Sequence, residues 1–361
     1  MLRITVPPEM SGQRFDKYLK RLMPQIPSGI LYKSLRKKNI TLCGRKADGS
    51  EKIESGDFLE LFFAPETLKT FGLHVSLQGE NVPEGKERAQ AKSLAKSLAK
   101  SQTLTAGKID PARIVFENEH LLVYNKPAGV LTQKAGPEDE SLNEMLLRYL
   151  YEKGEVTDAS LRLFHPSVGN RLDRNTEGLV LFGKTLAGSR WIAEGLKAHT
   201  IQKDYLTICA GIPPKEQVYE AVLSRDGSAR VSAVRKTGEG ARIRTDIKRI
   251  AVSSSQKTVS LVQVRLHTGK THQIRAQLSA EGYPLMGDPK YGDEAVNAWA
   301  HKTFGLRIQL LFAFHMTFPE NELGVPAQLT APPSERFSHI LNTLFGEEAY
   351  AHLEIPGTAG L

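Results

Sequence analysis

A charged loop near the middle of the chain has the clearest potential for chemistry. Residues 169–182 have the sequence GNRLDRNTEGLVLF, in which Asp173 stands between Arg171 and Arg174 and an apolar, strand-like stretch follows. Neighbouring cations favour the ionised form of a carboxylate, so Asp173 is available as a nucleophile rather than as a proton donor. A lone Arg-Leu-Asp tripeptide is more often a structural ion pair. The surrounding segments therefore decide which role Asp173 has.

Two segments further along supply an aromatic ring and a cation. Residues 201–208, IQKDYLTI, predict a strand whose Tyr205 can lie beside a bound base, although a strand tyrosine is also a common half-buried core residue. Residues 266–278, LHTGKTHQIRAQL, predict a strand end, a glycine turn and a helix capped by Thr271. On this helix Arg275 can hold a carboxylate by a two-pronged hydrogen bond, or it can form a surface salt bridge. The turn-rich loop 282–292 can form a wall of a site but carries no obvious catalytic group.

Other chemistries are disfavoured by residue spacing. The two cysteines, Cys43 and Cys209, are far apart and form no CxxC pair. The histidines form no HExxH pattern, and His267 and His272 are five residues apart, which does not place them on one helical face. The chain also lacks GxGxxG, Walker-type and GxSxG motifs. We therefore expect no metal site, no nucleotide cofactor and no serine hydrolase.

The composition predicts a globular protein with an anionic partner. The 361 residues leave room for two domains, and 40% hydrophobic with 24% charged residues is ordinary for such a protein. A net charge of +8 points to a polyanion, most simply nucleic acid. The N-terminus lacks an apolar signal core, and no stretch approaches the ~20 apolar residues of a membrane span. With so few cysteines, we expect a cytoplasmic location.

Residues 1–64 have the pattern of a small α/β unit. A helix is expected over residues 12–22, where Phe15, Leu19 and Leu22 share one face. A second helix is expected from Ser28, its cap, to about residue 38, with Ile30, Leu31, Ser34 and Leu35 on its inner side. Lys33, Arg36 and Lys37 share its other face and are our candidates for contact with an RNA backbone. Short strands are expected at 40–42 and 58–62.

The composition changes twice after this unit. Residues 65–108 are rich in Lys, Ser and Ala, and we interpret them as a basic linker whose Lys92, Lys96 and Lys100 form a slowly rotating stripe. An auxiliary contact with RNA or the ribosome is the alternative. Residues 109–345 alternate irregularly between predicted strands and helices, which indicates an α+β catalytic domain. Residues 346–361 are expected to be a flexible tail.

Within residues 109–345 the expected strands and helices are well separated. The strands are expected at 114–116, 121–124, 179–182, 205–209, 242–249 and 259–266. The helices are expected at 141–153, 188–199 and 272–280.

Taken together, these segments resemble the RluA-like family of pseudouridine synthases over about residues 110–320. The matching elements, in family order, are Asn125-Lys-Pro-Ala-Gly129, Arg171-Leu-Asp173 with Thr176 and Gly178, Lys203-x-Tyr205, Thr268-Gly-Lys-Thr-His-Gln-Ile-Arg275 and Leu311 to Pro319. Single elements are weakly specific, but five in order are highly specific. Residues 1–64 resemble the S-four-type RNA-binding domain that often precedes this catalytic domain. The chain departs from the common pattern at Asn170 and Glu177, where many members have His and Ser.

The resemblance implies a mixed, mainly antiparallel sheet flanked by helices, and an isomerase that needs no cofactor. Uracil is detached from the ribose, rotated and rejoined through carbon five. Asp173 is the implied nucleophile, with attack at the anomeric carbon or at ring carbon six both open. Arg275 is implied to pair with Asp173, and Tyr205 to stack on the uracil and to help remove the carbon-five proton. We expect Leu172, Thr176 and Leu278 to line the substrate pocket.

The same reaction requires that the target uridine be flipped out of the folded RNA. By position, Arg171 can fill the vacated stack and Arg174 can hold a phosphate. We expect a monomer that acts on structured RNA, most simply large-subunit ribosomal RNA. Transfer RNA is an alternative target, and a non-catalytic ribosome-assembly factor is an alternative function that has no need of an intact Asp173, Tyr205 and Arg275 set.

Overall fold

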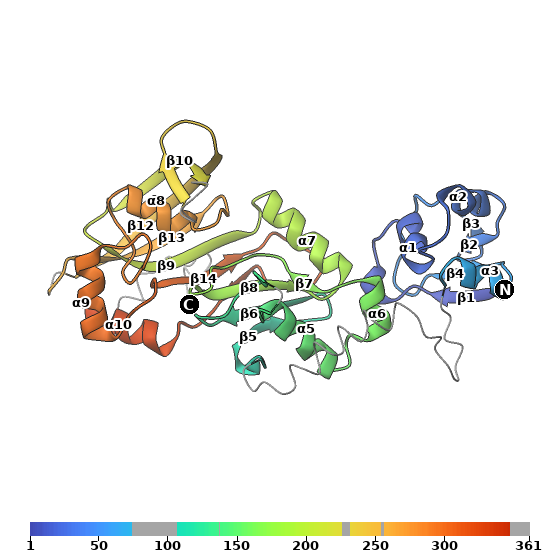
Figure 1. Cartoon of the computed structure of the whole chain (residues 1–361), viewed down its shortest axis with the longest axis horizontal. Coiled ribbons are helices and arrows are strands. Elements are labelled where there is room, and N and C mark those ends of the chain that lie inside the picture. The colour runs from blue at the N-terminus through green and yellow to red at the C-terminus, as the bar shows by residue number, and fades with distance from the viewer. Residues whose placement is uncertain (74–106, 137, 226–231, 254–255, 347–361) are drawn as a thin grey trace.

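The computed structural model describes residues 1–73, 107–136, 138–225, 232–253 and 256–346. The stripe predicted at Lys92, Lys96 and Lys100 and the tail after residue 346 lie outside these ranges. Figure 1 shows an elongated molecule with the N-terminal unit at one end and a long twisted sheet filling the rest. The predicted α+β class is confirmed.

The N-terminal unit is a four-stranded antiparallel sheet in the order β1-β4-β2-β3 with short helices packed on it. Its elements are β1 (Leu2–Thr5), η1 (Pro8–Met10), α1 (Phe15–Leu22), α2 (Ser28–Arg36), β2 (Ile40–Leu42), β3 (Arg45–Lys46), β4 (Phe58–Leu61) and α3 (Pro65–Thr70). The core includes Phe15, Leu19, Leu31 and Leu35 from α1 and α2. The predicted basic face of α2 is exposed at Lys33, Arg36 and Lys37.

Four details of this unit differ from the sequence-based expectation. Helix α1 begins at Phe15 rather than at residue 12, because Gly12 has a φ of +76°, outside the helical region. The N-cap of α2 is Pro27, so Ser28 is not the cap. Ile30 is exposed rather than turned inward. Residues 65–70, expected as the start of a linker, form α3, and Leu68 contributes to the core of the unit.

The N-terminal unit contacts the larger one through both polar and apolar groups. Arg21 Nη1 donates a hydrogen bond of 2.9 Å to the carbonyl of Leu163, and Arg190 donates to the carbonyl of Gly12. Phe164 and Leu186 also pack against the N-terminal core. The unit therefore lies against α6 (Asp158–Leu163) and α7 (Leu186–Lys197), as Figure 1 shows for α6.

The larger unit is built on an eleven-stranded sheet, whose main path runs β11-β10-β12-β13-β9-β14-β8-β6-β5. Its strands are β5 (Ile114–Glu117), β6 (Leu121–Lys126), β7 (Ser167–Val168), β8 (Glu177–Gly183), β9 (Gln202–Ala210), β10 (Glu216–Arg225), β11 (Ser232–Arg235), β12 (Ala241–Ser253), β13 (Val259–Leu266), β14 (Leu311–Thr317) and β15 (Gln328–Thr330). The remaining helices are η2 (Pro111–Arg113), α5 (Leu142–Glu152), α8 (Gln273–Ala280), α9 (Glu294–Phe304) and α10 (Glu335–Phe345). The predicted strands and helices are confirmed, whereas strands β7, β10, β11, β14 and β15 and helices α6, α9 and α10 were not foreseen.

Both faces of this sheet are covered, which explains the continuous apolar runs of its central strands. In β6, Leu121 and Val123 belong to one core while Leu122 and Tyr124 belong to the other. Side chains of α5 and α8 pack into the second core, and those of α7, α9 and α10 pack into the first. The sheet is therefore a buried middle layer between two layers of helices.

One parallel contact joins the two halves of the sheet. Strands β14 and β8 pair in parallel, whereas every other strand pair on the main path is antiparallel. Ala313 of β14 lies between Gly178 on β8 and Tyr205 on β9. Gly178 has a φ of +116°, and a Cβ there would lie 2.2 Å from the carbonyl oxygen of Ala313. This close approach brings the Asp173 loop, which precedes β8, beside the Tyr205 strand.

Candidate active site

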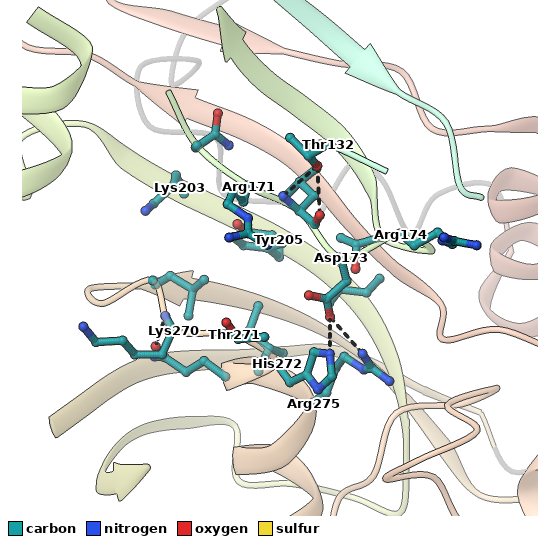
Figure 2. Close-up of a pocket in the computed structure, with 18 of the residues that line it drawn as sticks. Thr132, Arg171, Asp173, Arg174, Lys203, Tyr205, Lys270, Thr271, His272 and Arg275 are labelled. Atoms are coloured by element: carbon teal, nitrogen blue, oxygen red, sulfur yellow. Dashed lines mark hydrogen bonds and ion pairs between the residues drawn. The ribbon is translucent and has the colours of Figure 1, made fainter. Parts of the chain in front are cut away.

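A cavity of about 650 Å³ lies between the Asp173 loop and the segment that joins β13 to α8. Its volume is in the range of small-molecule and nucleotide sites. Figure 2 shows its walls, which come from residues 131–133, the loop 169–176, strand β9 and residues 266–275. Leu172 and Thr176 line it, as expected. Leu278 does not, because its side chain points into the core under α8 and is fully buried there.

Asp173 and Arg275 meet inside this cavity. Nη1 of Arg275 donates a hydrogen bond of 2.8 Å to Oδ2 of Asp173. The side chain of Asp173 is 22% exposed, whereas that of Arg275 is only 6% exposed. Both side chains line the cavity, and the carboxylate is more exposed there than the cation behind it. In Figure 2 the second oxygen of Asp173 points away from Arg275.

The two-pronged hydrogen bond of Arg275 goes to a different carboxylate from the one expected. Nε and Nη2 of Arg275 donate to the two oxygens of Asp288, at 2.7 and 2.8 Å. Oδ1 of Asp288 also accepts from the backbone amides of Lys290 and Tyr291. Asp288 lies in the turn-rich loop that showed no catalytic group in the sequence. Asp288 fixes the plane of the guanidinium, so that an N–H of Nη1 is directed at Asp173.

The electrostatics of this chain of groups agree with its geometry. Burial raises the pKa of Asp288, but the hydrogen bond and charge of Arg275 outweigh burial, so the pKa stays below its usual value. Burial lowers the pKa of Arg275, but Asp288 and then Asp173 raise it above the ordinary arginine value. Arg275 is therefore a permanent cation between two carboxylates.

His272 is a further group beside Asp173. It is the N-cap of α8, with φ 60° and ψ 18°, a left-handed conformation that non-glycine residues rarely adopt. Its Nε2 lies 3.8 Å from Oδ2 of Asp173, and its Nδ1 lies 3.1 Å from the hydroxyl of Tyr291. Burial lowers the pKa of His272, although Asp173 raises it. Thr271 was expected to cap this helix, but the N-cap is the next residue, His272. The side-chain oxygen of Gln273 accepts a hydrogen bond from the amide of Lys270 just before the helix.

Strand β9 presents two side chains to the cavity. Tyr205 and Lys203 alternate with Asp204, which points to the other face and pairs with Arg265 at 2.9 Å. Tyr205 is 5% exposed, and burial, followed by the charge of Asp173, raises the pKa of its phenol. The ring is therefore neutral at physiological pH. Burial also lowers the pKa of the Lys203 amine.

The backbone of the Asp173 loop is held from below by the 125–129 segment. Nζ of the fully buried Lys126 donates to the carbonyls of Pro127, Val130 and Arg174, at 2.9 to 3.0 Å. The amide of Gly129 donates to the carbonyl of Arg174 as well. Three donors of an ammonium group thus match three carbonyl acceptors. Lys126 and Gly129 therefore anchor the backbone of the Asp173 loop.

Two polar side chains fix the other end of the loop. The amide of Asn170 bridges to strand β8, accepting from the backbone of Leu181 at 2.7 Å and donating to that of Leu179 at 3.2 Å. Thr132 exchanges two hydrogen bonds with the backbone of Leu172. The loop is therefore fixed on both sides of Asp173. Sequence analysis marked Asn170 only as a departure and did not foresee Thr132.

The remaining predicted residues divide into two groups. Arg171 and Arg174 flank Asp173, line the cavity and are exposed. Lys33, Arg36 and Lys37 lie on α2 of the N-terminal unit and do not line the cavity. Across the described ranges, no three His, Cys, Asp or Glu side chains gather as a metal site would require. The helices in those ranges are all too short or too polar to cross a membrane.

Comparison with known proteins finds similar sequences among the RNA pseudouridine synthases. Residues 120–280 match the RNA pseudouridylate synthase family. The ribosomal large subunit pseudouridine synthase D of Zymomonas mobilis is 34% identical over 211 residues, which cover 58% of this chain and 65% of that protein. Synthase C of Rickettsia bellii is 28% identical over 339 residues, covering 91% of this chain and 97% of that one.

A solved structure supports the same fold. The human RNA pseudouridylate synthase domain containing 4 superposes with a TM-score of 0.50 at 22% identity, over 70% of this chain and 96% of that one. All the residues that line the cavity except Leu311 lie within the matched residues 120–280. This part of the chain is similar to the RNA pseudouridylate synthases, and the similarity indicates an isomerase that acts on RNA.

Proposed function

We propose that this protein converts specific uridines of large-subunit ribosomal RNA to pseudouridine, with Asp173 as the nucleophile. The observation that carries the proposal is the Asp173 carboxylate, fixed by Arg275 at the wall of an open cavity that Tyr205 also lines. Asp288 immobilises Arg275, and Arg275 holds Asp173 in one orientation before the substrate binds. Less conformational entropy is therefore lost when Asp173 attacks.

The proposed reaction has three steps at this cavity. Oδ1 of Asp173 attacks the anomeric carbon or ring carbon six, and the bond between the sugar and ring nitrogen one breaks. The detached uracil rotates on the Tyr205 ring and rejoins the sugar through carbon five, and the bond between Oδ1 of Asp173 and the carbon that it attacked breaks, which returns the free carboxylate. Carbon five then loses its proton and nitrogen one gains one, so the product is an isomer of the substrate. We assign Tyr205 to stacking. Its raised pKa keeps the phenol protonated at neutral pH, so the phenolate that would accept a proton is not formed.

Two groups of residues support the choice of a large RNA. The relatives named above are ribosomal large subunit enzymes. The exposed cations Lys33, Arg36 and Lys37 on α2 suit a phosphate backbone, and we propose that residues 1–73 form an RNA-binding domain. Arg171 is proposed to fill the stack that the flipped uridine leaves, and Arg174 to contact a phosphate.

Pseudouridine mapping in total RNA tests this proposal. Cells that lack the protein are compared with cells that carry the wild-type chain or the Asp173→Asn chain. Loss of specific ribosomal pseudouridines, restored only by the wild type, is the expected result. Loss confined to transfer RNA redirects the proposal to that target. Unchanged maps, or restoration by Asp173→Asn, contradict an enzymatic role and favour a binding factor.

A further inference from the structure

The end of the cavity away from Asp173 carries cations that the chemistry proposed above leaves unused. Figure 2 shows Lys203 and Lys270 at this end, opposite Asp173, His272 and Arg275. Lys203 comes from β9, and Lys270 comes from the loop before α8. Within the part of the chain that the structure describes, neither lysine forms an ion pair with an acidic side chain. Both lysines are therefore available to an anionic group of a ligand.

Lys203 is the better fixed of the two cations. It points into the cavity from the same face of β9 as Tyr205 and is half-buried. Its Nζ lies over the loop backbone, where a Cβ added to Gly269 would be 3.6 Å away. Burial lowers the pKa of this amine, which shows that its charge has lost part of its hydration. A partly desolvated cation without a counter-ion gains most when a ligand anion binds.

The arrangement of the cavity selects one kind of anion. Lys203 and Lys270 line the same cavity as Asp173, so an RNA strand whose sugar reaches Asp173 has its backbone in the cavity that holds these cations. The anions of an RNA strand are its phosphodiester groups, one on each side of every nucleotide. We propose that Lys203, assisted by Lys270, binds one of the two phosphodiesters that flank the flipped uridine. This inference rests on the proposed function and assigns a role in positioning the substrate.

The proposal is tested by removing the charge from the RNA phosphodiester and from Lys203, separately and together. An RNA fragment that contains the mapped uridine is prepared with either flanking phosphodiester replaced by a neutral methylphosphonate. Wild type, Lys203→Met and Lys203→Arg are compared by RNA affinity and by single-turnover conversion. Lys302→Met, which removes an exposed lysine on α9, is the matched control.

One of the two replacements is expected to weaken binding to the wild type roughly 5- to 20-fold, and its position identifies which phosphate is bound. Lys203→Met is expected to weaken binding to unmodified RNA by a similar factor and to lower the salt dependence by roughly 0.7 to 0.9 of a counter-ion. In the Lys203→Met protein, the methylphosphonate replacement that weakens wild-type binding is expected to reduce RNA affinity by less than about twofold. Lys203→Arg is expected to bind within about threefold of the wild type, because the charge remains.

Two results would overturn the inference. One is a wild-type protein that binds both methylphosphonate fragments as tightly as the unmodified fragment, a comparison that needs no variant to fold. The other is independence, in which Lys203→Met and each replacement weaken binding by factors that simply multiply. Failure of the wild type to form pseudouridine in the unmodified fragment counts against the proposed function instead, so the two failures remain distinguishable.

Discussion

At the scale of single residues, the site depends on a carboxylate that does not itself face the cavity. Asp288 holds Arg275 by two hydrogen bonds, and Arg275 uses a third to hold Asp173. Asp173, Tyr205 and Arg275 stood out in the sequence because each lies in a recognisable motif. Asp288 did not, because nothing in a turn-rich segment shows which carboxylate will face an arginine on the preceding helix.

Asp288→Asn is predicted to lower turnover with little effect on RNA affinity. The amide offers only one acceptor oxygen to Arg275, which frees the guanidinium to rotate away from Asp173. We expect kcat to fall roughly 30-fold and the free energy of unfolding to fall by about 3 kcal/mol, since one charge of a buried pair is lost. Single-turnover kinetics and chemical denaturation measure the two effects. Glu152→Gln, an exposed change on α5, is the control. Weakened RNA binding at unchanged kcat would contradict this positioning role.

At the scale of elements, the parallel contact between β8 and β14 sets the position of the Asp173 loop relative to Tyr205. The apolar run of β8 made that strand predictable, whereas residues 311–317 of β14 were noted only as part of the family resemblance. Strand β10 was not predicted, because its sequence EQVYEAVLSR mixes charged with apolar residues at one edge of the sheet. The start of α8 was also missed by a residue, since His272 adopts a left-handed conformation that sequence patterns do not reveal.

Gly178→Ala is predicted to disturb this contact. A methyl group at that position meets the carbonyl of Ala313, so β8 and β14 must separate. We expect a loss of roughly 2 to 4 kcal/mol in the free energy of unfolding and at least a tenfold loss of activity. Gly154→Ala is the matched control, because Gly154 also has a positive φ (75°), but a Cβ added there would meet no atom within 4 Å. Equal destabilisation by the two variants would show that backbone strain, not the strand contact, is responsible.

His315 on β14 is predicted to make the protein less stable in acid. His315 is fully buried, and its Nδ1 lies 2.8 Å from the hydroxyl of Thr330. Its pKa is lowered mainly by burial; the charge of Asp204 opposes this effect and that of Arg265 adds to it. Between the folded pKa and about 6.5, the unfolded chain binds a proton that the folded protein does not, so stability falls as the pH falls through this window. Below the folded pKa both states are protonated and the loss stops.

Denaturation at a series of pH values checks this prediction. His315→Gln is expected to reduce the slope of unfolding free energy against pH by up to about 1.4 kcal/mol per pH unit below pH 6.5. His165→Gln, at an exposed position, is the control. An unchanged slope in the His315 variant would mean that other groups cause the acid lability.

At the scale of the whole molecule, we propose that the N-terminal unit adds RNA contacts to those made at the cavity. The basic face of α2 is on the N-terminal unit, and the cavity is in the larger one. A compact α/β pattern and a dense strand-rich pattern are both visible in the sequence. The contribution of α3 to the first core was not foreseen, because its apolar residues are too few to be recognised as part of a core.

Replacing Lys33, Arg36 and Lys37 together with Gln is predicted to weaken RNA binding without changing turnover at saturating RNA. The salt dependence of binding is expected to fall by roughly 2 to 3 counter-ions, one for each lost phosphate contact. The control is a protein with Lys17, Lys20 and Lys69 replaced by Gln, which loses the same charge at other exposed positions of the unit. Equal effects of the two triple variants would show that net charge, not the α2 face, governs binding.

The central claim is that the carboxylate of Asp173 is the nucleophile. Asp173→Asn keeps the shape of the side chain, and Arg275 keeps its partner Asp288, so the fold should persist. The most direct measurement is single-turnover pseudouridine formation in the mapped ribosomal RNA fragment, with RNA affinity and melting temperature measured in parallel. We predict a loss of at least about a thousandfold in rate, with affinity within about threefold of the wild type. An Asp173→Asn protein that still converts its uridine within about tenfold of the wild-type rate would contradict the account.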